Sequence, residues 1–219
     1  MKNKVPEALR FNRYIETGEL RAVEPRDDET YPIEGYAIVY EERTNIGGWF
    51  EEVVKSGAVN GADLTDVPFF IHHQQNKIPL ARSRRNNGNS TMTLTPDTKG
   101  LQFRADLDGK RNTEAKALYS AVERKDITGM SYRFSVKEER WSRLDTDLPL
   151  REIIRFGKIG EISALWSPQY DGTSIKEARA EALDSADRAA LDSARATLES
   201  EKNEQEALNK LKLTILKES

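Results

Sequence analysis

The chain contains no cysteine, and that absence excludes several kinds of chemistry. Disulfides, thiolate catalysis and cysteine-ligated zinc all need a thiol. Histidine is almost as scarce, since the 219 residues hold only two, His72 and His73, which are adjacent. Any catalysis that depends on histidine must therefore use this pair. The lack of cysteine also fits a reducing compartment such as the cytoplasm.

Long apolar runs and a strong excess of one charge are missing as well. No run approaches the roughly 20 residues of a membrane span, and the N-terminus lacks the apolar core of a signal peptide. The formal net charge is −3, and basic residues do not cluster with aromatic ones. We therefore expect no membrane insertion and no direct binding of nucleic acid. Nothing in the sequence indicates a cofactor or a bound metal.

The apolar runs that are present predict a mixed α+β fold. Short runs of aromatic and β-branched residues, separated by turn residues, are typical of strands. The predicted strands cover 33–40, 67–73, 90–96, 101–107, 129–136 and 152–166. A helix is predicted over 113–125, where apolar residues recur at helical spacing behind a capping Asn112 or Thr113. A long, weakly amphipathic helix is predicted from about residue 176, because glycine and proline are absent after Gly172.

These patterns divide the chain into three parts. Residues 1–28 are mixed and charged and are interpreted as an N-terminal arm. Residues 29–177 form the predicted domain, which is long enough to bury a core of its own. Residues 178–219 form a charged helical tail, whose alanine-rich face would bury little area by itself. The tail is either a partner-binding or oligomerising element or a solvated extension.

The stretch "ITGMSYRFS" contains a candidate nucleophile. Ser131 follows Gly129 by two residues, and glycine leaves room for a substrate to approach. On a strand, Ser131 and Arg133 would share one face and Tyr132 the other. Such a serine can attack a carbonyl while the arginine or a backbone N–H stabilises the oxyanion. The alternative is a strand serine beside a solvated arginine.

The histidines and one carboxylate raise similar alternatives. On a strand over 67–73, His72 and His73 would point to opposite faces, so only one of them can face a given cleft. That histidine is either a catalytic base or a hydrogen-bonded core residue. Glu161 lies in the apolar run "KIGEISALW" and needs a partner if it is buried. An imidazole N–H and the guanidinium of Arg155 are both candidates.

Five stretches between residues 33 and 175 together resemble one known family in the same order. They are "IEGYAIVYEERTNIGGWFEEVVKSGAV", "FFIHHQQNKIPLARS", "TLTPDTKGLQFRADL", "ITGMSYRFSV" and "IGEISALWSPQYDGTSI". Each is similar to a segment of the caudovirus prohead proteases, whose core resembles that of the herpesvirus assemblin protease. The resemblance implies a small, mostly antiparallel β-barrel flanked by helices, and a serine endopeptidase activity.

The resemblance also implies a Ser-His-Glu triad. Ser131 is the serine of the family's G-M-S motif and would be the nucleophile. His73 holds the position of the family histidine and would act as general base and acid. Glu161 is the acid of the E-x-S motif and would orient His73. These roles agree with the chemistry of the side chains, because a serine hydroxyl needs a base and the imidazole needs a carboxylate to fix its tautomer.

Four residues depart from the family pattern. His72 replaces an asparagine, Gln74 an aspartate, Arg133 a glycine and Gln169 an alanine. Assemblin proteases use a second histidine as the third triad member, so His72 is an alternative to Glu161. Arg133 and Tyr132, which follow the nucleophile, are the candidates for residues near the oxyanion.

The function implied by the resemblance is capsid maturation. Such an enzyme would work inside the procapsid in the host cytoplasm, with the major capsid protein and the scaffold as partners. It would cleave the scaffold, or the scaffold-like segment of the capsid protein, and itself. The alternative is a non-catalytic scaffold or assembly factor with an inherited barrel. The sequence leaves open whether the protein acts as a homo-oligomer.

Overall fold

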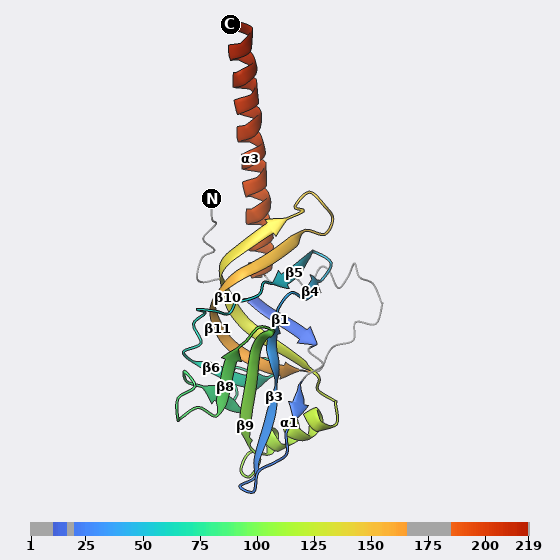
Figure 1. Cartoon of the computed structure of the whole chain (residues 1–219). Helices are drawn as coiled ribbons and strands as arrows, with labels where there is room; N and C mark the ends of the chain where they lie inside the picture. Colours follow the sequence, from blue (N-terminus) through green and yellow to red (C-terminus); the bar gives the residue numbers. More distant parts are fainter. Residues whose placement is uncertain (1–10, 17–19, 166–184, 219) are drawn as a thin grey trace.

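The computed structural model describes residues 11–16, 20–165 and 185–218 (Figure 1). Side chains are described from 20 to 165 and from 185 to 213. Gln169 and the predicted start of the tail helix, 176–184, lie outside these ranges. Within the described ranges, neither helix combines the length and the apolar character needed to cross a membrane.

The described elements are strands in the first three quarters of the chain, one short helix among them, and a long helix at the end. In chain order they are β1 (Phe11–Glu16), β2 (Arg21–Ala22), β3 (Thr30–Val39), β4 (Arg43–Ile46), β5 (Phe50–Val54), β6 (Val67–Ile71), β7 (Ala81–Ser83), β8 (Met92–Pro96), β9 (Gly100–Asp108), α1 (Thr113–Glu123), β10 (Gly129–Ser142), β11 (Leu150–Leu165) and α3 (Ser185–Glu218). The fold is therefore a mixture of helices and strands, as the sequence predicted.

The strands form two sheets. The larger has the order β1-β10-β11-β5-β4, with β6 beside both β11 and β7, and the smaller has the order β2-β3-β9-β8. The pairing is mostly antiparallel, and the exceptions both involve β11. This strand pairs in parallel with β5 near its beginning and with β6 near its end. One long strand thus carries two neighbours at separate points along its length.

The predicted barrel is not found. Among the described strands, β1 and β4 are at opposite ends of the main strand order of the larger sheet and do not pair with each other. A barrel requires its first and last strands to pair, with a matching tilt and stagger. Instead, both sheets contribute to one hydrophobic core, and Phe69 of the larger sheet stacks on Phe103 of the smaller at 5.8 Å between ring centroids.

Helix α1 packs against strands β2, β3 and β9 of the smaller sheet, with the apolar stripe that its sequence pattern predicted. The four apolar residues at helical spacing are buried: Ala115, Leu118, Tyr119 and Val122. Of the two predicted caps, Asn112 is the one used. Its side-chain oxygen accepts the N–H groups of Glu114 and Ala115 at 3.0 and 3.2 Å, which satisfies donors that a helix N-terminus leaves unpaired.

Helix α3 starts on the body of the protein and then leaves it, as Figure 1 shows. Its first turns are packed, because Ala186, Ala190, Leu191 and Ala194 are all buried. Further along, Leu208, Leu211 and Leu213 are more than half exposed. Ala186 and Ala190 belong to the hydrophobic core, so the alanine-rich face is packed at this end of the helix.

Candidate active site

The pairing of β10 with β11 gathers four polar side chains on one face. Ser131 lies opposite Ser163, and Arg133 lies opposite Glu161. Directly opposed residues of an antiparallel pair project to the same side, as do residues two apart on one strand. Ser131, Ser163 and Glu161 are all at most 2% exposed, so the cluster begins in the interior of the protein.

Both histidines lie in a turn that follows β6. The strand ends at Ile71, two residues earlier than predicted, and His72 and His73 both have left-handed backbone conformations with φ of 50° and 55°. The expectation that they point to opposite faces of a strand is therefore wrong. The turn is held because the His72 N–H donates to the Ala164 carbonyl at 3.1 Å. Two successive non-glycine residues in this region are costly, and such strain is typical of functional sites.

The turn brings His73 between the other two predicted residues. Its Nε2 lies 2.6 Å from Ser131 Oγ, and its Nδ1 makes a hydrogen bond and ion-pair contact with Glu161 Oε1. The three residues come from the turn after β6, from β10 and from β11. When Nδ1 carries its proton and donates it in a hydrogen bond to Glu161, Nε2 is free to accept the proton of the serine hydroxyl.

Three donors surround the buried carboxylate of Glu161. Besides His73, the Ser163 hydroxyl donates to Oε1 at 3.1 Å, and the Gln75 amide donates to Oε2. Burial acts to raise the pKa of Glu161, but the hydrogen bonds from His73 and Gln75 and the charge of His73 outweigh it and hold the pKa below its usual value. The carboxylate is therefore ionised at neutral pH, as a residue that stabilises an imidazolium must be.

Gln75 is part of this site, although no pattern in the sequence pointed to it. Its side-chain oxygen accepts a hydrogen bond from Arg133 Nη1 at 2.8 Å, while its nitrogen donates to Glu161. Arg133, which was a candidate for a residue near the oxyanion, thus contacts Gln75, and Gln75 in turn contacts Glu161. Gln75 follows the histidine turn, and the contact of its side chain with Glu161 joins it to β11.

The remaining sequence candidates lie elsewhere. The ring of Tyr132 is buried among Phe134 and Phe156, at 5.2 and 6.1 Å between ring centroids, so only its main chain adjoins Ser131. Arg155 pairs with Glu138 at 2.6 Å and leaves the imidazole as the partner of Glu161.

His72 is next to the site in sequence, but the contacts of His73 leave it no place in the hydrogen-bond chain. Both ring nitrogens of His73 are engaged, by Glu161 and by Ser131. Burial, and to a smaller extent the charge of His73, lower the pKa of His72. A histidine in this environment favours the neutral form.

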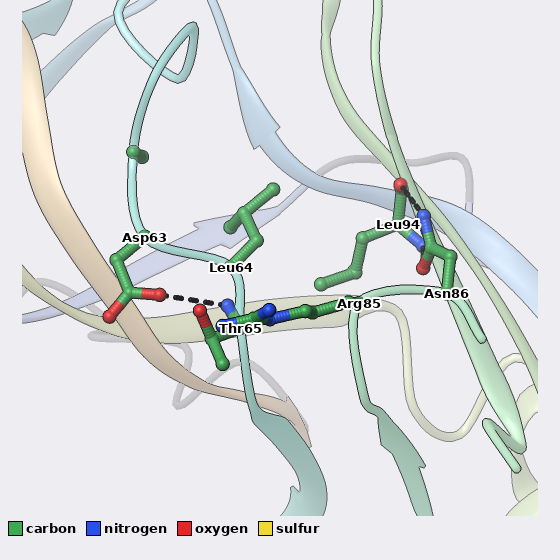
Figure 2. A pocket seen from close by; sticks show the side chains of 7 residues that line it. Asp63, Leu64, Thr65, Arg85, Asn86 and Leu94 are labelled. Carbon is green, nitrogen blue, oxygen red and sulfur yellow. Dashed lines mark hydrogen bonds between the residues drawn. The ribbon is translucent and has the colours of Figure 1, made fainter.

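A cavity of about 300 Å³ lies apart from these residues, between the segment before β6 and the turn after β7 (Figure 2). Its polar groups already serve the local backbone. Asp63 accepts the Thr65 N–H at 2.9 Å, and Asn86 bonds both the N–H and the carbonyl of Leu94 at 3.0 and 2.8 Å. None of the described triad residues lines it, so the cavity is not part of the candidate active site.

Comparison with protein families gives one match. The model of the caudovirus prohead serine proteases matches residues 16–188, which is most of the chain. The matched region includes Ser131, His73 and Glu161. The comparison with curated proteins finds no match, and neither does the comparison with solved structures.

Proposed function

We propose that this chain, which belongs to the caudovirus prohead serine protease family, is an endopeptidase that uses Ser131, His73 and Glu161 as its catalytic triad. The observation that carries the proposal is the unbroken chain of contacts from Ser131 Oγ through both nitrogens of His73 to Glu161. A nucleophile, a base and a residue that orients the base are the parts that acyl transfer requires.

The geometry suits a two-step hydrolysis. Ser131 Oγ attacks the scissile carbonyl while His73 Nε2 takes its proton, and His73 then returns that proton to the leaving amine. Water, activated by the same nitrogen, hydrolyses the acyl-enzyme. Glu161 accepts the hydrogen bond from the Nδ1–H of His73 throughout and stabilises the imidazolium that forms in each step.

Gln75 and Arg133 are positioning residues in this proposal. Arg133 holds the Gln75 side chain, and Gln75 occupies the carboxylate oxygen of Glu161 that His73 does not use. Groups that orient a catalytic carboxylate from behind restrict its rotation and keep its charge directed at the imidazole. The arginine at the family's glycine position therefore has a role in this chain, on the carboxylate side of the site.

The proposed substrates follow from the family. We expect cleavage of the scaffold, or of the scaffold-like segment of the major capsid protein, inside the procapsid in the host cytoplasm, together with self-cleavage. The test is to co-express the chain with its cognate capsid protein and scaffold and to measure intact masses. Discrete shortening that disappears with Ser131→Ala is the expected result.

The matched control is Ser135→Ala, which removes another buried serine hydroxyl from the same strand. Cleavage must persist in this variant. Unshortened products from the unmodified chain, with procapsids still forming, would contradict the proposal. That outcome would favour the alternative of a non-catalytic assembly factor.

We also propose that the exposed part of α3 binds the scaffold or the capsid protein. The packed turns before residue 195 anchor the helix, and the exposed Leu208 and Leu211 remain available to a partner. Replacing both leucines with glutamate is expected to exclude the protease from procapsids without lowering its stability. Normal packaging of this variant would contradict a role in binding.

A further inference from the structure

Strand β1 lies along the nucleophile strand, with the register centred on the site. Its six residues pair antiparallel with β10, and Tyr14 lies opposite Ser131. Arg13 and Ile15 lie opposite the two residues that flank the serine. A segment from the N-terminal end of the described chain thus runs directly beside the candidate nucleophile.

At Ser131, β10 has β11 on one side and β1 on the other. Strand β11 pairs there through Ser163 and carries Glu161, so it cannot leave without dismantling the site. Strand β1 is an edge strand of the larger sheet, because among the described strands it pairs only with β10. An edge strand can be exchanged for another extended segment with the same main-chain hydrogen bonds.

A polypeptide substrate has to reach this same place. Extended peptides commonly bind proteins by adding a strand to a sheet edge, where main-chain bonds provide the affinity. A peptide on the outer side of β1 would lie two strand spacings, about 10 Å, from β10. Attack needs the carbonyl carbon about 3–3.5 Å from the serine oxygen. Only pairing with β10 itself brings a peptide main chain within one strand spacing, about 5 Å, of the serine strand, and β1 holds that position.

The burial of Ser131 fits this picture. The serine is 2% exposed, and a large substrate cannot reach a side chain that is so enclosed. Something must therefore move before a peptide bond comes to Oγ. The exchangeable neighbour is the edge strand.

We propose that residues 11–16 occupy the edge of β10 to which an extended peptide substrate binds, so that the substrate must displace this segment. The inference rests on the proposed protease function, because it takes Ser131 as the nucleophile. It assigns the substrate as an extended peptide that pairs antiparallel with β10 in the register now held by β1. The chain's own N-terminal segment then acts as an intramolecular competitor.

The first experiment measures binding without catalysis. A fluorescent peptide with the sequence of residues 8–19, "ALRFNRYIETGE", is titrated into full-length chains that all carry Ser131→Ala. Two chains also carry proline pairs, either Asn12→Pro with Tyr14→Pro or Arg13→Pro with Ile15→Pro. Proline removes N–H groups from a strand, and one of the two pairs removes those that face β10.

The expected result is that at least one proline pair binds the peptide about tenfold more tightly than the chain with an intact β1, because the competing segment no longer holds the site. A scrambled peptide must not bind. Equal affinity in all three chains, or no binding in any, overturns the inference. If both proline pairs fail to fold, a specific protease site is inserted between Glu16 and Leu20. The folded Ser131→Ala chain is then cut, and exchange of its N-terminal fragment for the fluorescent peptide is measured, with absence of exchange overturning the inference.

The second experiment separates this inference from the proposed function. The same chains with Ser131 restored are treated with a fluorophosphonate, and the labelling of Ser131 is followed by intact mass. Faster labelling in the chain that binds the peptide supports both the occupied edge of β10 and the proposed protease function. Peptide binding without labelling supports the occupied edge and contradicts the activated serine. Labelling that is equally fast in all chains, with no peptide binding, supports the protease and overturns the inference.

Discussion

The two ends of β11 each bury a charged side chain, and they do so in opposite ways. Near the beginning of the strand, the fully buried Arg151 contacts the carboxylates of Glu52, Glu139 and Asp187 at 3.1, 2.9 and 3.1 Å. Near the end, Glu161 is just as buried, but its partners are an imidazole, an amide and a hydroxyl.

The difference lies in what the partners can do. The partners of Arg151 are fixed opposite charges that come from three separate segments, β5, β10 and the first turn of α3. Such a network joins these segments. Removing any one member leaves a buried charge that is no longer compensated. Two of the partners of Glu161 are an amide and a hydroxyl, and the third, His73, is an imidazole, whose two nitrogens can accept and return a proton. We infer that the first cluster fastens the long helix to the sheets, whereas the second is arranged to move a proton.

The largest expected effect is on catalysis at the Glu161 end. Glu161→Gln keeps the shape of the side chain but removes the charge that fixes the tautomer of His73 and stabilises its imidazolium. We expect the cleavage rate to fall by about 10⁴, which corresponds to about 5 kcal/mol in the activation barrier. Kinetics of scaffold cleavage measure it.

Glu152→Gln, on the same strand but in an ion pair with Arg140, is the control and must leave the rate unchanged. A fall of less than about tenfold in Glu161→Gln would show that the carboxylate is not required in this form.

The next effect is on stability at the Arg151 end. Arg151→Met leaves the buried carboxylates of Glu52 and Asp187 and the half-buried one of Glu139 without their shared cation, so we expect the free energy of unfolding to fall by about 3–5 kcal/mol. Denaturant unfolding measures it, and the labelling rate of Ser131 in the folded fraction is expected to stay the same.

Arg140→Met breaks an ion pair whose arginine is 66% exposed, and it is expected to lower the free energy of unfolding much less than Arg151→Met does. Equal losses in the two variants would mean that the buried network does not fasten α3.

A smaller effect on catalysis is expected from the residue behind the carboxylate. Gln75→Leu removes one donor from Glu161, and we expect kcat to fall by about 10- to 100-fold with KM unchanged. The hydrogen bond from Gln75 helps to hold the pKa of Glu161 down, so its loss raises that pKa. The acid limb of the rate profile therefore moves to higher pH.

Arg133 is linked to Glu161 through its hydrogen bond to Gln75. Arg133→Met is therefore expected to lower kcat less than Gln75→Leu does. If Gln75→Leu instead raised KM and left kcat unchanged, that result would indicate that Gln75 contacts the substrate.

The smallest effect concerns the dependence of stability on pH. The folded-state pKa of Glu161 is lowered, so its ionised form stabilises the fold above its ordinary pKa of about 4.5. That contribution is lost as the pH falls from there through the lowered pKa. The unfolding free energies of the unmodified chain and of Glu161→Gln are therefore expected to converge on acidification. Curves that stay parallel from pH 6 to pH 3 would contradict the lowered pKa.

Much of the local structure could be predicted because it depends on neighbouring residues. Alternation along 101–107 and helical spacing over 113–125 reflect which face of an element meets the core, and β9 and α1 follow these patterns. The order of the motifs predicted Ser131, His73 and Glu161 as a group, and the structure brings these three together. The motifs also predicted the family, which the comparison confirms.

Other features were predicted wrongly or were missed, because they depend on how distant segments of the chain meet. The strand at 67–73 was predicted too long, since apolar composition does not reveal that two histidines adopt a left-handed turn. The prediction of a barrel was wrong. Closure depends on pairing between the first and last strands of the sheet, and no single strand encodes that pairing. Gln75 was missed because its contact with Glu161 joins residues 86 positions apart.

The sequence by itself therefore determined which residue types were available for chemistry: two adjacent histidines, a serine after Gly-Met and a carboxylate in an apolar run. The family resemblance indicated His73, but only the tertiary structure decided that a left-handed turn after β6 brings its ring to Ser131. It also decided that Gln75 and Arg133 support the carboxylate and that β1 lies along the nucleophile strand. The physical reason is that periodicity along a chain encodes the face of each element, whereas register and turn conformation place atoms from different elements within hydrogen-bonding distance.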